Sequence, residues 1–200
     1  MSETFATRLA RWQFNLFPAY RGTGGRVTYI RHDWGEVHVR IPLSWRTRNY
    51  VGTIYGGSLY GAVDPIYMLM LLRVLGPAYT VWDKAASIRF RRPGRSTLSA
   101  TFELSSQLVD GIREELTRVP KLDRIFLVEL KDAAGIVHAS IEKTVHVSRR
   151  ETRSLVPDHR LGIDPGSAVG GQQTGQHGGG GEQRGAEPQD HGIGRGELVE

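Results

Sequence analysis

The stretch that decides the fold is LYGAVDPIYMLMLLRVL, residues 59–75. It is apolar on nearly every side when drawn as a helix, and a helix that is apolar all round is buried inside its domain. Gly76-Pro77 ends it. Its uninterrupted part is shorter than the ~20 residues that a membrane-spanning helix needs, because the run is broken by Asp64, Pro65 and Arg73. We therefore expect a core helix and no membrane span.

Residues on both sides of this helix alternate between apolar and polar, which predicts strands. Before it, apolar residues recur with period two around Asp33-Trp34-Gly35, and this indicates a hairpin. After it, residues 86–91, 97–104 and 125–147 alternate in the same way, the last with a turn at Ala134-Gly135. Such strands are antiparallel, with one buried face and one wet face. The positions expected on the wet face of the last strand are His138, Ser140, Glu142, Thr144 and His146.

The first residues predict an amphipathic helix that ends at Pro18. One of its faces carries Phe5, Leu9, Trp12 and Leu16, and another carries Arg8 and Arg11. The predicted order is thus a helix, a hairpin, one buried helix and about four more strands. Strands that do not alternate with helices indicate an α+β fold. Because the single apolar helix must be wrapped by the sheet, we expect the hotdog fold, in which a curved antiparallel sheet surrounds one central helix.

Composition divides the chain into a domain, residues 1–149, and a tail, residues 150–200. The tail is rich in Gly, Gln, Glu and Arg and lacks large apolar residues, so it cannot offset the entropy of ordering it and is predicted to be disordered. Residues 1–149 contain 21 Lys and Arg against 13 Asp and Glu, a net charge of +8. A basic domain suits an anionic partner, which could be nucleic acid, a membrane surface or a phosphate-bearing ligand such as coenzyme A.

Several classes of protein are excluded by composition. The chain has no cysteine, which excludes disulfides, thiol catalysis and thiolate metal sites. Its seven histidines are scattered without ligand spacing, so we expect neither a metal site nor a cofactor. The N-terminus does not resemble a signal peptide, and we expect a cytoplasmic protein.

The stretch most informative about chemistry is NYVGTIYGGSLYGAVD, residues 49–64. Two glycines, Gly56 and Gly57, open a predicted helix, where they allow an oxygen of a ligand to approach the backbone closely. The free N–H groups of the first turn would then point at that oxygen, which suits a carbonyl gaining negative charge in acyl transfer. Asp64 follows about two turns later, and a lone carboxylate in an apolar helix is a site candidate.

This spacing resembles that of phenylacetyl-CoA-type hotdog thioesterases, with Asn49, Gly52, the Gly56-Gly57 pair and Asp64 at matching positions. The later runs VWDKAA, residues 81–86, and FRRPG, residues 90–94, are similar to an uncharacterised branch of that superfamily, domain-of-unknown-function family 4442. The likeness covers roughly Gly25 to Val147.

The resemblance implies a homodimer or tetramer that hydrolyses an acyl-CoA-like thioester. Asp64 would attack the thioester or activate water across a dimer interface, the Gly57 N–H region would polarise the carbonyl, and Asn49 would position substrate or water. In our leading hypothesis the acyl chain lies along the helix near Leu59, Tyr60 and Val63, and Ser58 also contacts the substrate.

The densest basic patch consists of Arg89, Arg91, Arg92 and Arg95. One interpretation is a solvated strand face and turn. In the other, Arg91 and Arg92 contact the phosphates of coenzyme A, since guanidinium groups suit phosphate.

Two departures from the family pattern bear on turnover. Tyr55 stands where the thioesterases carry His, and a phenol donates a hydrogen bond but is a poor base near neutral pH. Pro65 removes a helical N–H directly after Asp64, so the helix should kink there. Alternatively, Asp64 and Pro65 simply begin a new helix as its N-cap and first residue, or Gly56-Gly57 is only a turn.

Two other functions remain open on the sequence. The first is a non-catalytic acyl-CoA or lipid binder, which Tyr55 in place of His favours. The second is nucleic-acid binding, which the +8 charge permits. It ranks last because the chain lacks the interleaved aromatic and basic residues of an RNA-binding sheet.

Overall fold

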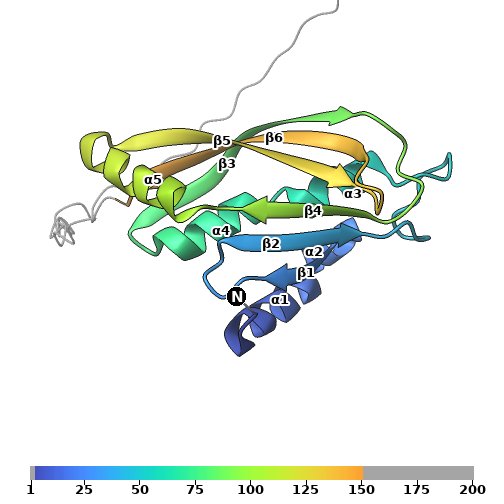
Figure 1. Ribbon diagram of the computed structural model, residues 1–200, viewed down its shortest axis with the longest axis horizontal. Helices are drawn as coiled ribbons and strands as arrows, with labels where there is room; N and C mark the ends of the chain where they lie inside the picture. The colour runs from blue at the N-terminus through green and yellow to red at the C-terminus, as the bar shows by residue number, and fades with distance from the viewer. Residues whose placement is uncertain (1–2, 151–200) are drawn as a thin grey trace, which may run out of the picture. The chain divides into compact units, whose positions relative to one another are not determined.

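The computed structural model describes residues 3–150 (Figure 1). The tail predicted for residues 150–200 therefore lies, after its first residue, outside the described residues. The predicted α+β class is confirmed by five helices and six strands within residues 3–150. Their bounds are α1 Phe5–Leu16, α2 Pro18–Thr23, β1 Arg26–Ile30, β2 Glu36–Ile41, α3 Gly56–Val63, α4 Ile66–Leu75, β3 Tyr79–Phe90, β4 Leu98–Glu103, α5 Ser106–Arg118, β5 Lys121–Lys131 and β6 Val137–Arg149.

The six strands form one antiparallel sheet in the order β1-β2-β4-β5-β6-β3. The predicted hairpin around residues 33–35 is confirmed, since β1 pairs with β2. The longest ladders join β6 to β5 on one side and to β3 on the other. As Figure 1 shows, α3 and α4 run along this curved sheet. The chain therefore has the hotdog fold that the sequence predicted.

The central helix is interrupted where Pro65 follows Asp64. The Asp64 N–H still donates to the Tyr60 carbonyl at 2.9 Å, and the ladder resumes when Leu69 donates to the Pro65 carbonyl at 3.0 Å. The hydrogen-bond ladder is broken here because proline has no N–H to continue the helix, whereas a bend of the helix axis stays a prediction. Both halves are buried, and the residues that enter the core are Leu59, Ala62, Val63, Ile66, Tyr67, Met70, Leu71 and Leu75.

By length and composition alone, Gly56–Leu75 could cross a bilayer, and half of its most apolar part is buried inside the domain. The core helix of a globular domain passes the same test. This apolar span is longer than the stretch 59–75 considered in the sequence, because it includes the first turn of α3 and continues through the short break at Pro65.

Two helices were not predicted. Pro18 does not merely end α1, because it is also the first residue of α2, a position where its fixed φ suits a helix. The second is α5, which connects β4 to β5. Ser105 caps it by accepting a hydrogen bond from the Leu108 N–H at 3.2 Å, and its buried face carries Val109, Ile112 and Leu116.

The wet face expected on β6 is wrong at three of five positions. His138, Ser140 and His146 are each less than a tenth exposed. The reason is that β6 lies inside the sheet between β5 and β3, so side chains of both neighbours cover it. His146, for example, stacks on Trp82 with ring centroids 4.7 Å apart, and its Nδ1 lies 2.7 Å from Asp123 Oδ1.

Candidate active site

Helix α3 begins at Gly56, so the glycine pair opens a helix as the sequence predicted. Tyr55 is its N-cap in extended conformation, and its carbonyl accepts from the Ser58 and Leu59 N–H groups at 3.0 and 3.1 Å. Gly56 and Gly57 are the first helical residues, so their N–H groups have no acceptor within the helix. Gly56-Gly57 is therefore a helix start and not merely a turn.

Both glycines are closely approached by aromatic rings. A Cβ on Gly56 would lie 2.9 Å from the Phe90 ring, and one on Gly57 would lie 2.3 Å from the ring of Tyr55. A side chain at either position would have to displace a ring. The absence of side chains thus keeps the first turn open between two aromatic residues.

A pocket of about 370 Å³ lies beside this first turn and brings together five of the predicted site residues. It joins the loop before α3, the start of α3 and the loop between β3 and β4. The lining residues are Asn49, Thr53, Ile54, Gly56, Leu59, Phe90, Arg91, Arg92, Pro93 and Gly94. The Arg91 Nε donates to Ser140 Oγ at 2.9 Å, which holds its guanidinium at the rim, and Arg92 is exposed.

The Asn49 side chain shapes the loop that lines this pocket. Its Oδ1 accepts from the N–H groups of Val51 and Thr53 at 3.1 and 3.0 Å, and its Nδ2 donates to Thr53 Oγ1 at 2.9 Å. Both ends of the amide are thereby engaged in the loop. A direct role of Asn49 in positioning substrate or water stays a prediction.

Asp64 lies at the end of α3 in an ion-pair cluster that the sequence analysis did not foresee. Its Oδ1 accepts from Lys143 Nζ at 2.5 Å, and the same ammonium lies 3.1 Å from Asp83 Oδ2. The Lys143 side chain is 1% exposed, whereas that of Asp64 is 38% exposed. The carboxylate of Asp64 is thus reachable from solvent while its cationic partner is buried beneath it.

The alternative in which Asp64 caps α4 is wrong. No side chain caps α4, and Pro65 occupies its N-cap position. The Asp64 side chain instead contacts Lys143 on β6. Gly57, Tyr60 and Asp64 follow one another along the partly exposed face of α3, whereas Ser58 and Leu59 are buried on the opposite face.

The electrostatics of the cluster keep its lysine charged. Burial opposes the charge on Lys143, but the hydrogen bond to Asp64 and the charges of Asp64 and Asp83 outweigh it and raise the pKa of Lys143 above its ordinary value. Burial raises the pKa of Asp83, and its proximity to Lys143 only partly offsets this. The Asp83 Oδ1 is buried and has no hydrogen-bond partner among residues 3–150.

Tyr60 closes the cluster from the side of α3. Its ring centroid lies 5.5 Å from Lys143 Nζ, which is within range of a cation–π contact. Burial and the neighbouring carboxylate of Asp64 raise the pKa of its phenol, so Tyr60 remains a hydrogen-bond donor at neutral pH. Tyr55, in contrast, is 59% exposed and lies at the opposite end of the helix from Asp64.

Lys143 had a signal in the sequence. It occupies an inward position of β6, between Ile141 and Val145, on a face that is otherwise apolar from Val137 to Val147. A lysine that interrupts an apolar strand face needs an acid opposite it. Asp83 and Lys84 are adjacent in the sequence but have different partners, since Asp83 pairs with Lys143 and Lys84 with Asp123 at 2.6 Å.

Residues 3–150 contain no group of three or more His, Asp or Glu side chains that could hold one metal ion. A family model described as domain of unknown function (DUF4442) matches residues 6–147. The chain belongs to the DUF4442 family. No curated protein sequence matches it significantly.

Solved structures share the fold of this DUF4442 protein at low identity. A protein of unknown function from Pseudomonas aeruginosa, named a probable thioesterase, superimposes with a TM-score of 0.65 and 20% identity over 75% of this chain and 100% of its own. A thioesterase from Haemophilus influenzae superimposes with a TM-score of 0.56 and 15% sequence identity, over 76% of this chain and 97% of its own. A protein with unknown function from Chlorobaculum tepidum superimposes with a TM-score of 0.60 and 12% sequence identity, over 72% of this chain and 95% of its own.

Proposed function

We propose that this protein is a cytoplasmic acyl-CoA thioesterase whose active site is completed by a second copy of the chain. The observation that carries the proposal is the solvent-accessible carboxylate of Asp64, held over the buried ammonium of Lys143 at 2.5 Å on the helix whose glycine pair exposes free N–H groups. A carboxylate that is fixed in position and reachable from solvent is what attack on a thioester requires.

The substrate would lie across the start of α3. Its carbonyl oxygen would accept from the N–H groups at Gly56 and Gly57, where the positive end of the helix dipole favours developing negative charge. The acyl chain would follow the helix past Tyr60. The phosphates of coenzyme A would meet Arg91 and Arg92 at the rim of the 370 Å³ pocket.

The second copy is suggested by β3. This strand is an edge of the sheet over twelve residues, Tyr79–Phe90, and an edge of that length invites pairing with another strand. Its inward side chains Ala86 and Phe90 are exposed, although the start of α3 lies against one side of the Phe90 ring. Pairing of two β3 strands about a two-fold axis would cover these residues and close a cleft beside Asp64.

The reaction is the hydrolysis of a thioester. In one route Asp64 of the partner subunit takes a proton from water as the water oxygen bonds to the carbonyl carbon. The C–S bond then breaks and the proton passes from Asp64 to the leaving sulfur, which releases a carboxylic acid and a thiol. In the other route Asp64 itself bonds to that carbon, the thiolate leaves, and water hydrolyses the resulting anhydride. In both routes Lys143 holds the carboxylate and stays protonated.

The second candidate is a binder of acyl-CoA or lipid without turnover. Two observations favour it: Tyr55 replaces the histidine of the thioesterases, and the Asp64 carboxylate is already engaged by the ammonium of Lys143 at 2.5 Å. The two candidates share a site and differ only in whether thiol is released.

Thiol release from a panel of acyl-CoA esters, followed with a thiol-detecting dye, tests the proposal. We expect turnover by the full chain and a loss of about 10²–10⁴-fold in Asp64→Asn. The matched control is Asp123→Asn, which also removes a carboxylate from a lysine pair, on the outer face. If the protein binds acyl-CoA but releases no thiol, the non-catalytic binder is the correct function. Equal rates of thiol release for Asp64→Asn and Asp123→Asn would refute the mechanism.

A further inference from the structure

Helix α1 exposes the side that amphipathic helices normally bury. Phe5, Leu9, Trp12 and Leu16 form one stripe along it and are 80, 49, 59 and 60% exposed. Phe17 continues the stripe past the end of the helix and is 60% exposed. At 1.5 Å per residue the stripe is about 16 Å long. An exposed apolar patch of this kind marks an interaction surface.

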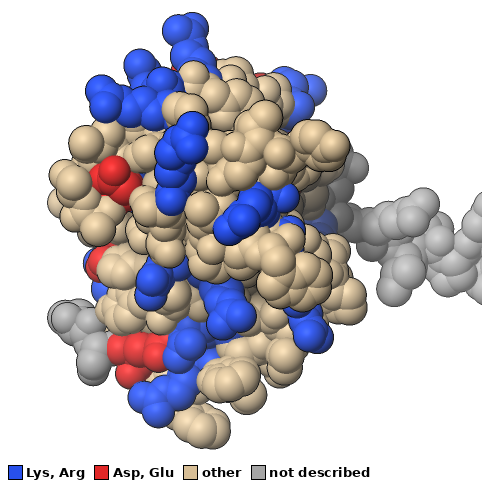
Figure 2. Space-filling model, turned by 90° about the vertical axis from the view of Figure 1, so that its right-hand side faces the viewer, with Lys and Arg blue, Asp and Glu red and all other residues tan. Residues whose placement is uncertain are grey.

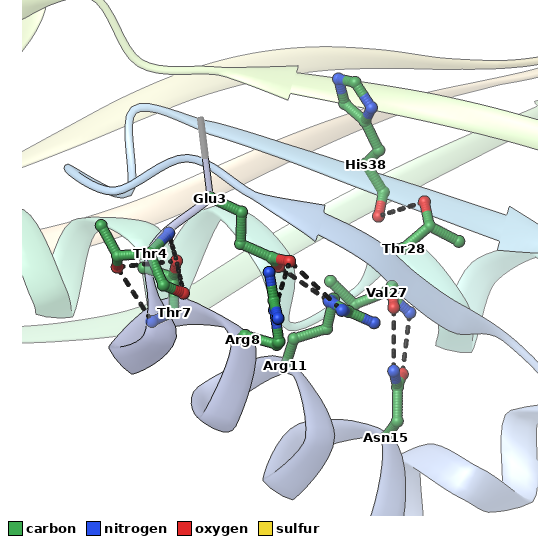
Figure 3. A network of polar contacts seen from close by, with 9 residues as sticks. All are labelled: Glu3, Thr4, Thr7, Arg8, Arg11, Asn15, Val27, Thr28 and His38. Carbon is green, nitrogen blue, oxygen red and sulfur yellow. Dashed lines mark hydrogen bonds and ion pairs between the residues drawn. The ribbon is translucent and has the colours of Figure 1, made fainter. Parts of the chain in front are cut away.

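This orientation is held by specific polar contacts, which Figure 3 shows. Asn15 grips β1 at both ends of its amide: Nδ2 donates to the Val27 carbonyl and Oδ1 accepts from the Val27 N–H, each at 2.8 Å. Arg11 donates to Glu3 at 2.8 Å, and Thr4 and Thr7 cap the first turn. The side of α1 that faces its own domain therefore carries Thr7, Arg11, Phe14 and Asn15, and the apolar stripe lies on the outward side.

The surroundings of the stripe are basic. A hollow of about 620 Å³ beside it is lined by Arg11, Arg21, Arg26 and Arg46 and by no acidic residue. Trp45, on the loop after β2, is 87% exposed, and the Arg46 guanidinium lies 5.7 Å from its ring. Figure 2, which looks at the end of the domain to which β2 runs, shows Lys and Arg spread widely and few Asp and Glu.

We propose that this surface, the α1 stripe with Trp45, Arg21, Arg26 and Arg46, docks the protein onto an anionic lipid bilayer. Tryptophan, phenylalanine and leucine on one side with arginines beside them is the composition of a helix that lies in a membrane interface. Anionic headgroups complement the arginines, and the apolar side chains enter the acyl boundary. A second copy of the chain fits less well, because a two-fold contact would bring the same arginines together.

The surface stays free in the proposed dimer. α1 packs against β1, and β1 is the edge of the sheet opposite to β3. Pairing through β3 therefore leaves the stripe of each copy exposed. The inference does not require hydrolysis, and its test needs no substrate.

Co-sedimentation of the full chain with lipid vesicles tests the proposal. We expect binding to phosphatidylcholine vesicles that contain ~30% phosphatidylserine, weak binding to phosphatidylcholine alone, and release as NaCl is raised from ~0.1 to ~0.5 M. Trp12→Glu should lower the partition coefficient by about tenfold or more, since one large apolar side chain no longer enters the lipid. Arg21→Gln with Arg46→Gln should lower binding to the anionic vesicles selectively.

The matched control is Ile125→Glu, which places the same charge at an apolar residue 66% exposed on β5. It should bind vesicles as the unaltered chain does. Failure of the unaltered chain to bind anionic vesicles overturns the proposal, as does equal binding by Trp12→Glu. If Trp12→Glu changes the oligomeric state in sedimentation equilibrium while vesicles bind neither protein, the stripe is a contact between copies.

Discussion

Removing the ammonium of Lys143 should cost far more stability than removing a lysine from an exposed pair. Lys143 is 1% exposed and holds Asp64 at 2.5 Å and Asp83 at 3.1 Å. Breaking a buried pair on one side typically costs about 3–5 kcal/mol, because the remaining charge is buried without compensation. Asp64 is 38% exposed and can turn to water, so the loss for Lys143→Met should be about 2–4 kcal/mol.

Lys84 supplies the matched control. Its pair with Asp123 is as short, at 2.6 Å, but the two side chains are 55 and 37% exposed. Lys84→Met should therefore cost about 0–1 kcal/mol. Urea unfolding followed by circular dichroism measures both variants against the unaltered protein. The double-mutant cycle of Lys143→Met with Asp64→Asn should show coupling, since the two groups are in direct contact.

The deficit of Lys143→Met should depend on pH in one direction. Burial already raises the pKa of Asp83, and loss of the lysine raises it further. Between the unfolded pKa of 3.8 and that raised value, the folded state binds more protons than the unfolded state. Stability of the variant should then fall as pH rises from about 4 to 7. A deficit equal to that of Lys84→Met, or one that grows toward acid, would refute this account of the cluster.

Three further predictions concern local structure. Gly25→Ala would place a Cβ 2.5 Å from the Ala62 side chain of α3, so its free energy of unfolding should fall by about 1–3 kcal/mol in urea unfolding. Gly111→Ala has open space around it in α5, so its free energy of unfolding should rise by about 0.5–1 kcal/mol. Asn15→Ala should lower the free energy of unfolding by about 1–3 kcal/mol and speed amide hydrogen exchange in α1, because both hydrogen bonds to Val27 are lost. The Arg31 guanidinium lowers the pKa of Asp33 to about 2, so NMR titration should show its charge, and the stability it contributes, lost as pH falls from 3.8 toward that value.

Local pattern was enough to predict most of the scaffold. The apolar run 59–75 had to be buried, alternating residues had to form strands, and a sheet around one helix follows from burying both. Gly56-Gly57 as a helix start and the break at Pro65 also depend only on neighbouring residues, because backbone freedom and a missing N–H act within one turn. The helix α5 was overlooked even though its apolar spacing is local.

The contacts of the candidate site depend on the tertiary structure. Asp64 and Lys143 are 79 positions apart, and only the register of β6 against its neighbours and the packing of α3 on the sheet bring them together. The outward stripe of α1 is likewise set by distant partners, since Asn15 binds the backbone of β1 and Phe14 packs on the core from the same side of the helix. Periodicity shows which residues share a face. Which way that face points is decided by the groups it meets after folding, and these are far away in the chain.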